Sequence, residues 1–315
     1  MKAIFYEKNG GAEVLQYGDR PQPEVKKGQL LVRVHAASVN PVDWKLRENK
    51  LLSPVTALSG GVVPGRDLAG DVVETGEGVT RFKTGDKVFG MLDSIDGGAY
   101  AEFALIPEAV AEFIPDNISY LEAAAVPLVS PTALQALRDK GELTQGEHVL
   151  VNGASSAVGL FAVQLAKLLG ATEVTGVCST AHVDLVKEVG ADRVIDYKKE
   201  DFTEEKNRYD LIFDAVAKST FASSKGSLRE NGRFVTTVPS PKDILGFATS
   251  VFSDKKAKSL LVADKGPDLF LIGEWLQAGK LKVIIDKVYP LQEAAEAHRY
   301  SEQGEASGKI VLDVK

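Results

Sequence analysis

The sequence predicts an α/β protein in which a doubly wound parallel sheet is joined to a second, β-rich domain. A strand–helix alternation runs from about residue 123 to 263. Within it, a turn with a glycine at each end separates an apolar strand from an apolar helix. Residues 1 to about 110 instead read as short strands divided by Gly and Pro turns. The alternation is typical of a parallel sheet, and the N-terminal pattern of a small barrel or sandwich.

Composition limits the classes of protein to consider. The chain has 315 residues, 44% of them hydrophobic, which is enough for about two domains. The net charge of −7 argues against nucleic-acid or membrane binding, since such surfaces need clustered cations. The single cysteine, Cys178, excludes an intramolecular disulfide and a four-cysteine zinc site. No apolar run approaches the roughly 18 residues of a membrane helix, and a strand pattern begins at once, so we expect a cytoplasmic protein.

The β-rich domain comes first along the chain. Turns such as Lys27-Gly28 and Thr84-Gly85-Asp86 punctuate it, and helices then lead into the alternating region. The expected strands are residues 2–6, 30–34, 71–74, 87–91 and 99–106, and the expected helices are residues 120–127 and 131–140.

The alternating region is organised around one βαβ unit. An apolar strand at 149–151, a small-residue turn, a buried helix at 157–169 and a strand at 173–178 should form a right-handed crossover. Unpaired N–H groups at the helix start favour an anionic pyrophosphate. Ser156 replaces the middle glycine of the usual pattern, so a plain βα turn that binds nothing is the alternative. The expected phosphate contacts are Gly153, Ser155, Ser156, Ala157, Val158 and Gly159.

Beyond this unit the alternation continues, and the tail is expected to return to the first domain. No element is predicted over residues 239–256, where the pattern is compatible with a flap. The domains are expected at 1–122 with 264–315, and at 123–263. The expected strands are residues 193–195, 209–214, 233–238, 257–262, 281–288 and 309–314, and the expected helices are 183–189, 220–228, 267–278 and 291–302.

Six ordered motifs give the chain a family resemblance over nearly its whole length. They resemble the medium-chain dehydrogenase/reductase superfamily, in particular its quinone oxidoreductases of zeta-crystallin type and the plant chloroplast enone and alkenal reductases. The resemblance implies a GroES-like β-barrel catalytic domain and a Rossmann domain. The motifs are Ser-Val-Asn-Pro-Val-Asp-Trp-Lys at 38–45, Pro-Gly-Arg-Asp-Leu-Ala-Gly-Asp-Val-Val-Glu-Thr-Gly at 64–76, Phe-Lys-Thr-Gly-Asp-Lys-Val at 82–88, Gly-Gly-Ala-Tyr-Ala-Glu at 97–102, the turn at 153–159, and Gly-Lys-Ile-Val-Leu at 308–312.

The resemblance also implies a reductase without zinc. The zinc alcohol dehydrogenases of this superfamily have a cysteine where this chain has Asn40 and a histidine where it has Arg66. Neither residue can replace the Cys, His or carboxylate ligands that zinc prefers. The four histidines are dispersed along the chain, so we expect no metal site. Arg66 and Asp67 are interpreted as a structural pair.

The end of the second nucleotide-domain strand favours NADPH. An NAD site places an acidic residue there, about 20 residues past the glycine turn. Here no carboxylate occurs before Asp184, whereas Ser179 and Thr180 could donate to a 2′-phosphate. The resemblance adds His182, and Tyr197 with Lys198 after the third strand, to this cage, although all these residues could be ordinary capping residues. It also implies that Thr132 reaches the nicotinamide half. The other expected cofactor contacts, at strand ends, are Ala215, Val216 and Val238.

Hydride addition to an enone or quinone leaves negative charge on the carbonyl oxygen, which a placed donor must stabilise. Lys45 is the main candidate, as a clamp or proton donor, and a matching lysine occurs in the enone-reductase relatives. Asp43 could orient Lys45 or the nicotinamide ribose, Asn40 could line the nicotinamide pocket, and Tyr100 could donate a hydrogen bond to the carbonyl oxygen. The alternative is structural, because Asn40, Pro41 and Asp43 suit a helix start.

The leading hypothesis is therefore an NADPH-dependent, zinc-independent reductase of quinones or α,β-unsaturated carbonyl compounds. The alternative is an NADPH-binding structural, sensor or RNA-associated protein, and a zinc alcohol dehydrogenase is the weakest interpretation. A homodimer is expected through residues 256–262, with no nucleic-acid or membrane partner.

Overall fold

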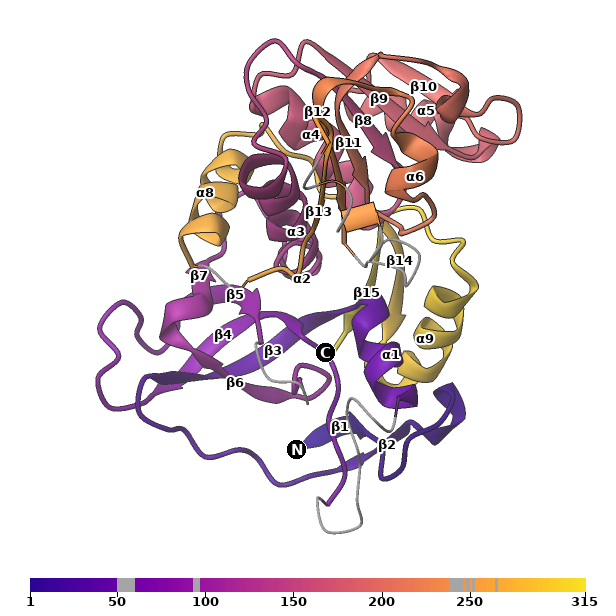
Figure 1. The fold of residues 1–315 in the computed structure, drawn as a ribbon. Coiled ribbons are helices and arrows are strands. Elements are labelled where there is room, and N and C mark those ends of the chain that lie inside the picture. The colour runs from indigo at the N-terminus through magenta and orange to yellow at the C-terminus, as the bar shows by residue number, and fades with distance from the viewer. Residues whose placement is uncertain (50–59, 93–96, 238–245, 248–249, 251–252, 264–265) are drawn as a thin grey trace. The chain divides into compact units, whose positions relative to one another are not determined.

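The computed structural model describes residues 1–49, 60–92, 97–237, 246–247, 250, 253–263 and 266–315. The chain divides into two compact units (Figure 1). Unit 1 comprises Met1–Leu128 and Asp264–Lys315, and unit 2 comprises Val129–Ala263. The first boundary expected from the sequence, after residue 122, falls inside helix α2 (Tyr120–Ala124), which belongs to unit 1. No helix in the described part is both long and apolar enough to cross a bilayer.

The largest sheet of unit 1 is built on one long strand, β3 (Gln29–Val39). It pairs antiparallel with β4 (Asp67–Thr75), β6 (Phe103–Pro107) and β15 (Lys309–Asp313). Both β3 and β4 are longer than expected from the sequence. The second half of β3 lies between β4 and β15, so tertiary pairing extends the strand through alanines that have little strand propensity.

The other strands of unit 1 complete this sheet and add a small one. The main sheet has the order β14-β15-β3-β4-β5-β7, so the C-terminal tail and the N-terminal strands share it. A separate antiparallel pair joins β1 to β2, and β2 was not expected. The strands are β1 (Lys2–Phe5), β2 (Gln16–Asp19), β5 (Lys87–Met91), β7 (Ala111–Phe113) and β14 (Ile285–Pro290).

The helices of unit 1 carry clear start and stop signals. Helix α1 (Pro41–Glu48) has Asn40 as its N-cap and proline at its first position. Helix α9 (Ala294–Gln303) ends at Gly304, whose φ of +70° suits glycine. The remaining long helix of this unit is α8 (Gly266–Gln277). Buried residues of β3, β4 and α9 meet in one apolar core, which fixes α9 against the sheet.

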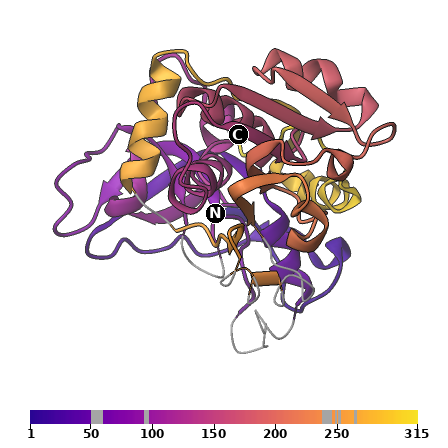
Figure 2. The same ribbon diagram turned by 45° about the horizontal axis from the view of Figure 1, so that its top comes forward.

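Unit 2 contains the predicted doubly wound parallel sheet (Figures 1 and 2). Its order is β10-β9-β8-β11-β12-β13, so the direction of winding reverses between β8 and β11. Ligands of such sheets bind at the carboxyl ends of the strands beside this reversal. The strands are β8 (His148–Asn152), β9 (Glu173–Cys178), β10 (Arg193–Asp196), β11 (Tyr209–Asp214), β12 (Leu228–Thr236) and β13 (Lys256–Ser259).

Three helices accompany the strands as expected, and one expectation is wrong. The three are α3 (Val129–Gln135), α4 (Ala157–Leu168) and α5 (Val183–Glu188). The helix expected at 220–228 is only α6 (Phe221–Ser224). Backbone hydrogen bonds from Asn207 to Gly226 and from Tyr209 to Ser227 draw the chain out of the helix and into β12. Most of the segment at 239–256, where a flap was considered, lies outside the described residues.

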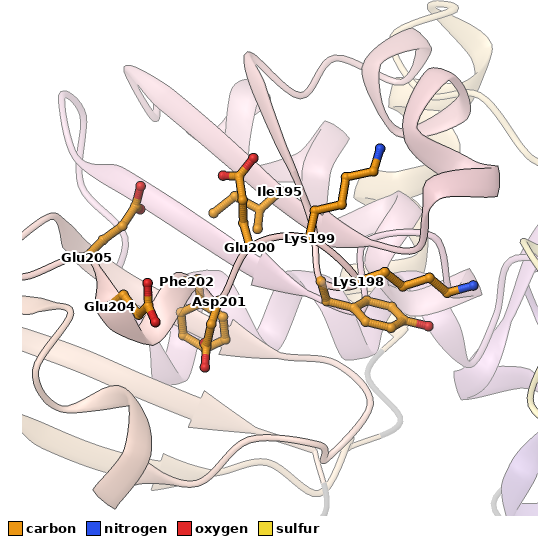
Figure 3. A pocket seen from close by; sticks show the side chains of 9 residues that line it. Ile195, Lys198, Lys199, Glu200, Asp201, Phe202, Glu204 and Glu205 are labelled. Carbon is orange, nitrogen blue, oxygen red and sulfur yellow. The ribbon is translucent and has the colours of Figure 1, made fainter.

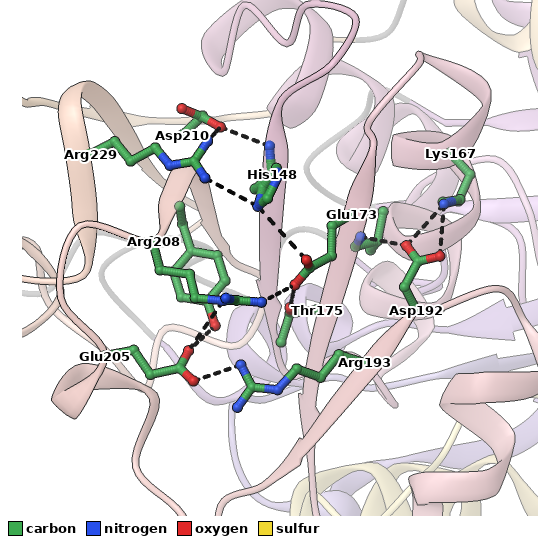
Figure 4. Close-up of polar contacts among 12 residues, drawn as sticks. His148, Lys167, Glu173, Thr175, Asp192, Arg193, Glu205, Arg208, Asp210 and Arg229 are labelled. Carbon is green, nitrogen blue, oxygen red and sulfur yellow. Dashed lines mark hydrogen bonds and ion pairs between the residues drawn. The ribbon is translucent and has the colours of Figure 1, made fainter.

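The amino ends of the unit 2 strands are joined by ion pairs (Figure 4). Arg229 of β12 donates to Asp210 Oδ2 at 2.8 Å and lies 3.3 Å from His148 Nδ1. Glu173 continues the network, because its carboxylate is 2.6 Å from Arg208 and 3.8 Å from His148. His148 therefore contacts a network of Arg, Asp and Glu side chains at the edge opposite the glycine turn.

Candidate functional site

The turn after β8 packs too closely for a side chain at either of its glycines. Gly153 has a φ of +78°, and a Cβ there would lie 2.5 Å from Val216 Cγ1. A Cβ on Gly159 would lie 2.1 Å from the carbonyl oxygen of Gly153. Because this second contact is with backbone, it cannot be relieved by a rotamer change. Gly159 thus allows α4 to begin directly against the turn, as in dinucleotide-binding folds.

Ser156, at the middle position of the motif, is the N-cap of α4. Its Oγ accepts a hydrogen bond from the Gly159 N–H at 3.1 Å and donates to the Gly153 carbonyl oxygen at 2.8 Å. Its hydroxyl proton, which the sequence suggested for a phosphate, is therefore used inside the turn. Ser156 stabilises the helix start, a contribution of about 1 kcal/mol for such caps.

Backbone N–H groups at the start of α4 provide the anion-binding capacity instead. Within the described residues, the N–H groups of Ser155, Ala157 and Val158 have no hydrogen-bond acceptor. All three residues are partly exposed. Unpaired N–H groups and the positive end of the helix dipole together favour a phosphate. The turn, cleared of side chains by its glycines, fits the pyrophosphate of a dinucleotide.

The loop after β11 is held by one buried carboxylate, that of Asp214. Its Oδ2 accepts from the Ser219 N–H at 2.6 Å, and its Oδ1 accepts from the Asn152 side chain at 3.2 Å and the Val216 N–H at 3.3 Å. Burial raises the pKa of Asp214, and these hydrogen bonds oppose the rise. Ala215 N–H donates to the Asn152 carbonyl at 3.0 Å. The expected cofactor contacts Ala215 and Val216 are thereby fixed beside the glycine turn.

The expected 2′-phosphate residues lie together at the ends of β9 and β10. The parallel register pairs Asp196 with Cys178, and the Tyr197 N–H donates to the Cys178 carbonyl at 3.1 Å. Ser179 and Thr180 follow directly after Cys178. The Thr180 hydroxyl, expected to donate to a phosphate, instead donates to Asp196 Oδ2 at 2.6 Å. A carboxylate therefore does lie at this edge, on the third strand rather than the second.

A polar surface pocket of about 520 Å³ adjoins this cluster (Figure 3). Tyr197 lines it and is 60% exposed. The amino groups of Lys198 and Lys199 extend on one side of the loop, and Glu204 lies on the other. His182 is partly exposed at the end of the 3-10 turn that follows β9. The pocket is of mixed charge, because its lining includes, besides Tyr197 and the two lysines, the carboxylates of Glu200, Asp201, Glu204 and Glu205.

Two further expected contacts belong to unit 2. Thr132 lies in α3, all of whose residues are buried. Val238 lies outside the described residues. The single cysteine ends β9 as a buried thiol, and burial raises the pKa of Cys178 to about 11, so it remains protonated at neutral pH.

In unit 1, the expected catalytic residue Asn40 is part of a buried polar cluster around Asp67. Asp67 Oδ2 accepts from Ser38 Oγ at 2.7 Å and from Asn40 Nδ2 at 2.9 Å, and it lies 3.2 Å from Lys309 Nζ. Lys309 also donates to Asn40 Oδ1. The expected pairing of Asp67 with Arg66 is wrong, since among the described residues the guanidinium of Arg66 donates to the Leu92 carbonyl, at 3.5 Å, and not to Asp67. Antiparallel strands bring the distant Lys309 to Asp67 instead.

A second buried cluster gives a directed series of hydrogen bonds that ends at Asp43. The Arg47 guanidinium, which can only donate, lies 2.8 Å from His298 Nδ1. His298 must therefore carry its proton on Nε2, which is 3.4 Å from the Tyr100 hydroxyl. Tyr100 in turn donates to Asp43 Oδ2 at 3.1 Å. The same Oδ2 accepts from the Asn40 N–H at 2.8 Å, which caps α1.

Burial shifts the pKa values of this cluster strongly. It raises the pKa of Asp43 to about 6, against the stabilising hydrogen bond from Asn40. It lowers the pKa of His298 to about 3, with the charge of Arg47 adding to the effect, so the imidazole is neutral. Burial and the neighbouring Asp43 carboxylate also raise the pKa of Tyr100.

Exposure divides the four expected catalytic residues into two kinds. Asn40, Asp43 and Tyr100 are buried and engaged with one another or with neighbours in unit 1. Lys45 projects from α1 into solvent, with Nζ 5.5 Å from the Trp44 ring centroid. Its ammonium has no ion pair with the part of the chain that the structure describes. Lys45 is thus the one of the four whose charge is accessible.

Sequence reasoning placed the backbone of Asp214 beside the cofactor but gave its carboxylate no role, and it did not identify Asp196, His298 or Lys309. The two aspartates carried a usable signal, because Asp214 ends the strand expected at 209–214 and Asp196 directly follows the strand expected at 193–195. The partners of His298 and Lys309 could not be inferred from the sequence, since Arg47 and Asn40 are about 250 residues away along the chain.

Two protein families match parts of this chain. Residues 26–116 match the family described as the alcohol dehydrogenase GroES-like domain, and residues 189–312 match the family described as zinc-binding dehydrogenase. The chain is similar to the chloroplastic quinone oxidoreductase QR1 of Triphysaria versicolor, at 37% identity over 99% of this chain and 98% of the relative.

An enone-reducing relative and a solved structure agree with this match. The NADPH-dependent alkenal/one oxidoreductase of Arabidopsis thaliana is 33% identical over 99% of this chain and 79% of its own length. The quinone oxidoreductase of Coxiella burnetii superposes with a TM-score of 0.90 at 33% identity, covering 100% of this chain and 99% of that one.

Replacing Asp43 by Asn should change how stability depends on pH. The folded-state pKa of about 6 exceeds the ordinary value of 3.8, so the folded protein holds a proton that the unfolded chain has lost. Stability from this group is therefore present below about pH 4 and is lost as pH rises to about 6. Asn cannot ionise, so the unfolding free energy of D43N minus that of wild type should rise by about 2–3 kcal/mol over this interval.

Denaturant unfolding at pH 4, 5, 6 and 7 measures this difference. Asp19→Asn is the matched control: Asp19 is exposed and its hydrogen bond with Lys2 lowers its pKa, so the corresponding difference should change in the opposite direction. A difference for D43N that stays constant from pH 4 to 7 would show that Asp43 titrates normally.

Proposed function

Because the chain belongs to the medium-chain dehydrogenase/reductase superfamily, with quinone oxidoreductases and alkenal/enone reductases among its relatives, we propose that it reduces quinones or α,β-unsaturated carbonyl compounds with NADPH. The observation that carries the proposal is the glycine turn of unit 2. Its N–H groups at the start of α4 have no acceptor among the described residues, and Gly159 lies so close to the Gly153 backbone that only glycine fits there. NADPH supplies the hydride when bound.

Unit 2 provides the residues that would bind the cofactor. The N–H groups of Ala157 and Val158 would hold the pyrophosphate. Ala215 and Val216, fixed by the Asp214 carboxylate, would line the neighbouring segment. Their strands end side by side at the reversal of the sheet, where a dinucleotide is expected to bind.

We infer that the cofactor is NADPH rather than NADH. No carboxylate follows β9 directly, and the paired ends of β9 and β10 lead directly into Ser179 on one side and into the exposed Tyr197 and Lys198 on the other. A phosphate would find donors and positive charge there. The name of the Arabidopsis relative, which specifies NADPH, supports the same choice.

Zinc independence is also part of the proposal. Lys309 places an ammonium group 3.2 Å from Asp67 and donates to Asn40 Oδ1. A divalent cation beside this ammonium would be repelled, and the Asn40 amide is a poor zinc ligand. Within the described residues, no group of three His, Cys, Asp or Glu side chains could hold a metal ion.

Lys45 is the proposed electrostatic clamp on the reacting carbonyl. Its accessible ammonium could stabilise negative charge that develops on the oxygen, and it could supply the proton. The buried residues Asn40 and Asp43 act one step back, because they fix the start of the helix that carries Lys45. Tyr100, which is fully buried, fixes Asp43.

The direct test mixes the protein with NADPH and a panel of quinones, enones and alkenals. Loss of absorbance at the wavelength of the reduced nicotinamide, faster with NADPH than with NADH, is expected for at least one acceptor, in protein shown by metal analysis to lack zinc. Tight NADPH binding without turnover across the panel would favour the structural or sensor alternative. One zinc per chain, with activity lost on chelation, would restore the zinc-dependent interpretation.

Lys45→Ala should lower kcat while leaving NADPH affinity nearly unchanged, since Lys45 belongs to unit 1 and acts on the substrate. Loss of one charge-stabilising donor typically costs about 10²–10³ in kcat. Lys83→Ala, which removes another exposed lysine of unit 1, is the matched control and should have wild-type kinetics. Equal losses of kcat and of NADPH affinity in K45A would contradict a catalytic role.

We also propose that the protein is a homodimer paired through β13. This edge strand of unit 2 pairs only with β12 among the described residues, and Leu261 just beyond it is 91% exposed. Sedimentation velocity should give twice the chain mass for wild type, and Leu261→Glu should shift it towards the monomer. Phe270→Glu, at an exposed apolar residue of unit 1, should remain dimeric. A monomeric wild type would refute the proposal.

A further inference from the structure

Asp196 joins the two halves of the expected 2′-phosphate site. Its Oδ2 accepts from the Thr180 hydroxyl at 2.6 Å, on the segment after β9. Its Oδ1 accepts from the Lys198 N–H at 3.0 Å, on the segment after β10. Lys199 Nζ lies 3.3 Å from Oδ2. One carboxylate thus connects two chain segments, in addition to the strand pairing and to the hydrogen bond from the Tyr197 N–H to the Cys178 carbonyl.

The register of the strands places Asp196 where it can make these contacts. Asp196 is the last residue of β10 and lies opposite Cys178, the last residue of β9. The segments leaving the two strands therefore diverge from the same level of the sheet. Ser179 and Tyr197 lie on these segments, each one residue beyond the paired strand ends.

Hydrogen bonds from Thr180 and from the Lys198 N–H keep the Asp196 carboxylate ionised. The hydrogen bond from Thr180 is the main cause that lowers its pKa, and the Lys198 N–H and Lys199 add to the effect. Its side chain is 8% exposed, so little of it faces solvent. The carboxylate is therefore directed into the loop and is not available to bind ribose hydroxyl groups.

We propose that Asp196 is a positioning residue for the 2′-phosphate of NADPH: by holding Thr180 and the turn at Lys198, it sets Ser179 and Tyr197 at the spacing that the phosphate requires. This role rests on the proposed cofactor. It explains why an NADPH site tolerates a carboxylate at its edge, since both carboxylate oxygens already accept hydrogen bonds from donors within the protein. It also reassigns Thr180 from a phosphate donor to a partner of Asp196.

Two substitutions at Asp196 separate position from charge. Asp196→Ala removes both contacts and the charge. Asp196→Asn removes the charge but can keep both contacts, because its oxygen can accept from the Lys198 N–H while its amide donates to Thr180 Oγ1. Dissociation constants for NADPH and NADH, measured by nicotinamide fluorescence with the full-length protein, give the readout.

We expect D196A to weaken NADPH binding about tenfold, equivalent to roughly 1.4 kcal/mol, and to change NADH binding less than about twofold. D196N should bind NADPH as wild type does. Thr180→Val should weaken NADPH binding as D196A does, whereas Thr180→Ser, which keeps the hydroxyl, should bind NADPH as wild type does. The D196A/T180V double variant should bind NADPH no more weakly than D196A. Ser179→Asp gives the reference for a charge placed directly at the phosphate, and should reverse the preference towards NADH.

Other outcomes would overturn the proposal. Tighter NADPH binding in both D196A and D196N would show that Asp196 acts by repulsion. Equal weakening of NADPH and NADH would show that Asp196 only stabilises the fold. If D196A does not fold, T180V decides alone, because Thr180 is exposed: unchanged NADPH binding in T180V would overturn the proposal. A wild type without NADPH preference would overturn the proposed cofactor as well, whereas a preference that D196A leaves unchanged would overturn this inference alone.

Discussion

The backbone contact between Gly159 and Gly153 is the constraint on which the nucleotide unit depends. With no Cβ on Gly159, the first turn of α4 lies directly against the turn after β8. This contact places the start of α4, with the N–H groups of Ala157 and Val158, at the turn, and Ser156 stabilises it with two hydrogen bonds. Any larger residue at 159 would move the helix start and with it the anion-binding groups.

Buried carboxylates organise the loops around this contact. Asp214 and Asp196 each end a parallel strand, and each satisfies N–H or O–H donors of the loop that follows or adjoins it. In unit 1, Asp67 and Asp43 play the equivalent part around the start of α1. Acidic residues near a site for an anionic cofactor are thus compatible with binding, because their oxygens accept hydrogen bonds from donors within the protein.

The same principle separates structural from chemical roles in unit 1. Asn40, Asp43 and Tyr100 were candidates for catalysis from the sequence, and each proves to be buried with partners of its own. The structural and the catalytic interpretation of Asn40 and Asp43 are therefore compatible. These residues cap α1, and by doing so they hold in place the helix that carries Lys45. The accessible ammonium of Lys45 leaves it as the residue that could meet a substrate oxygen.

The sequence by itself determined the α/β class, the glycine turn, the positions of most strands along the chain and the family, because these follow from local periodicity, turn residues and contiguous motifs. Only the tertiary structure decided that β3 runs on to residue 39, that the helix at 220–228 gives way to β12, and that Lys309 rather than Arg66 pairs with Asp67. It also decided that Thr180 is bound to Asp196. These outcomes depend on strand register and on residues far apart in the chain, which side-chain pattern and propensity do not specify.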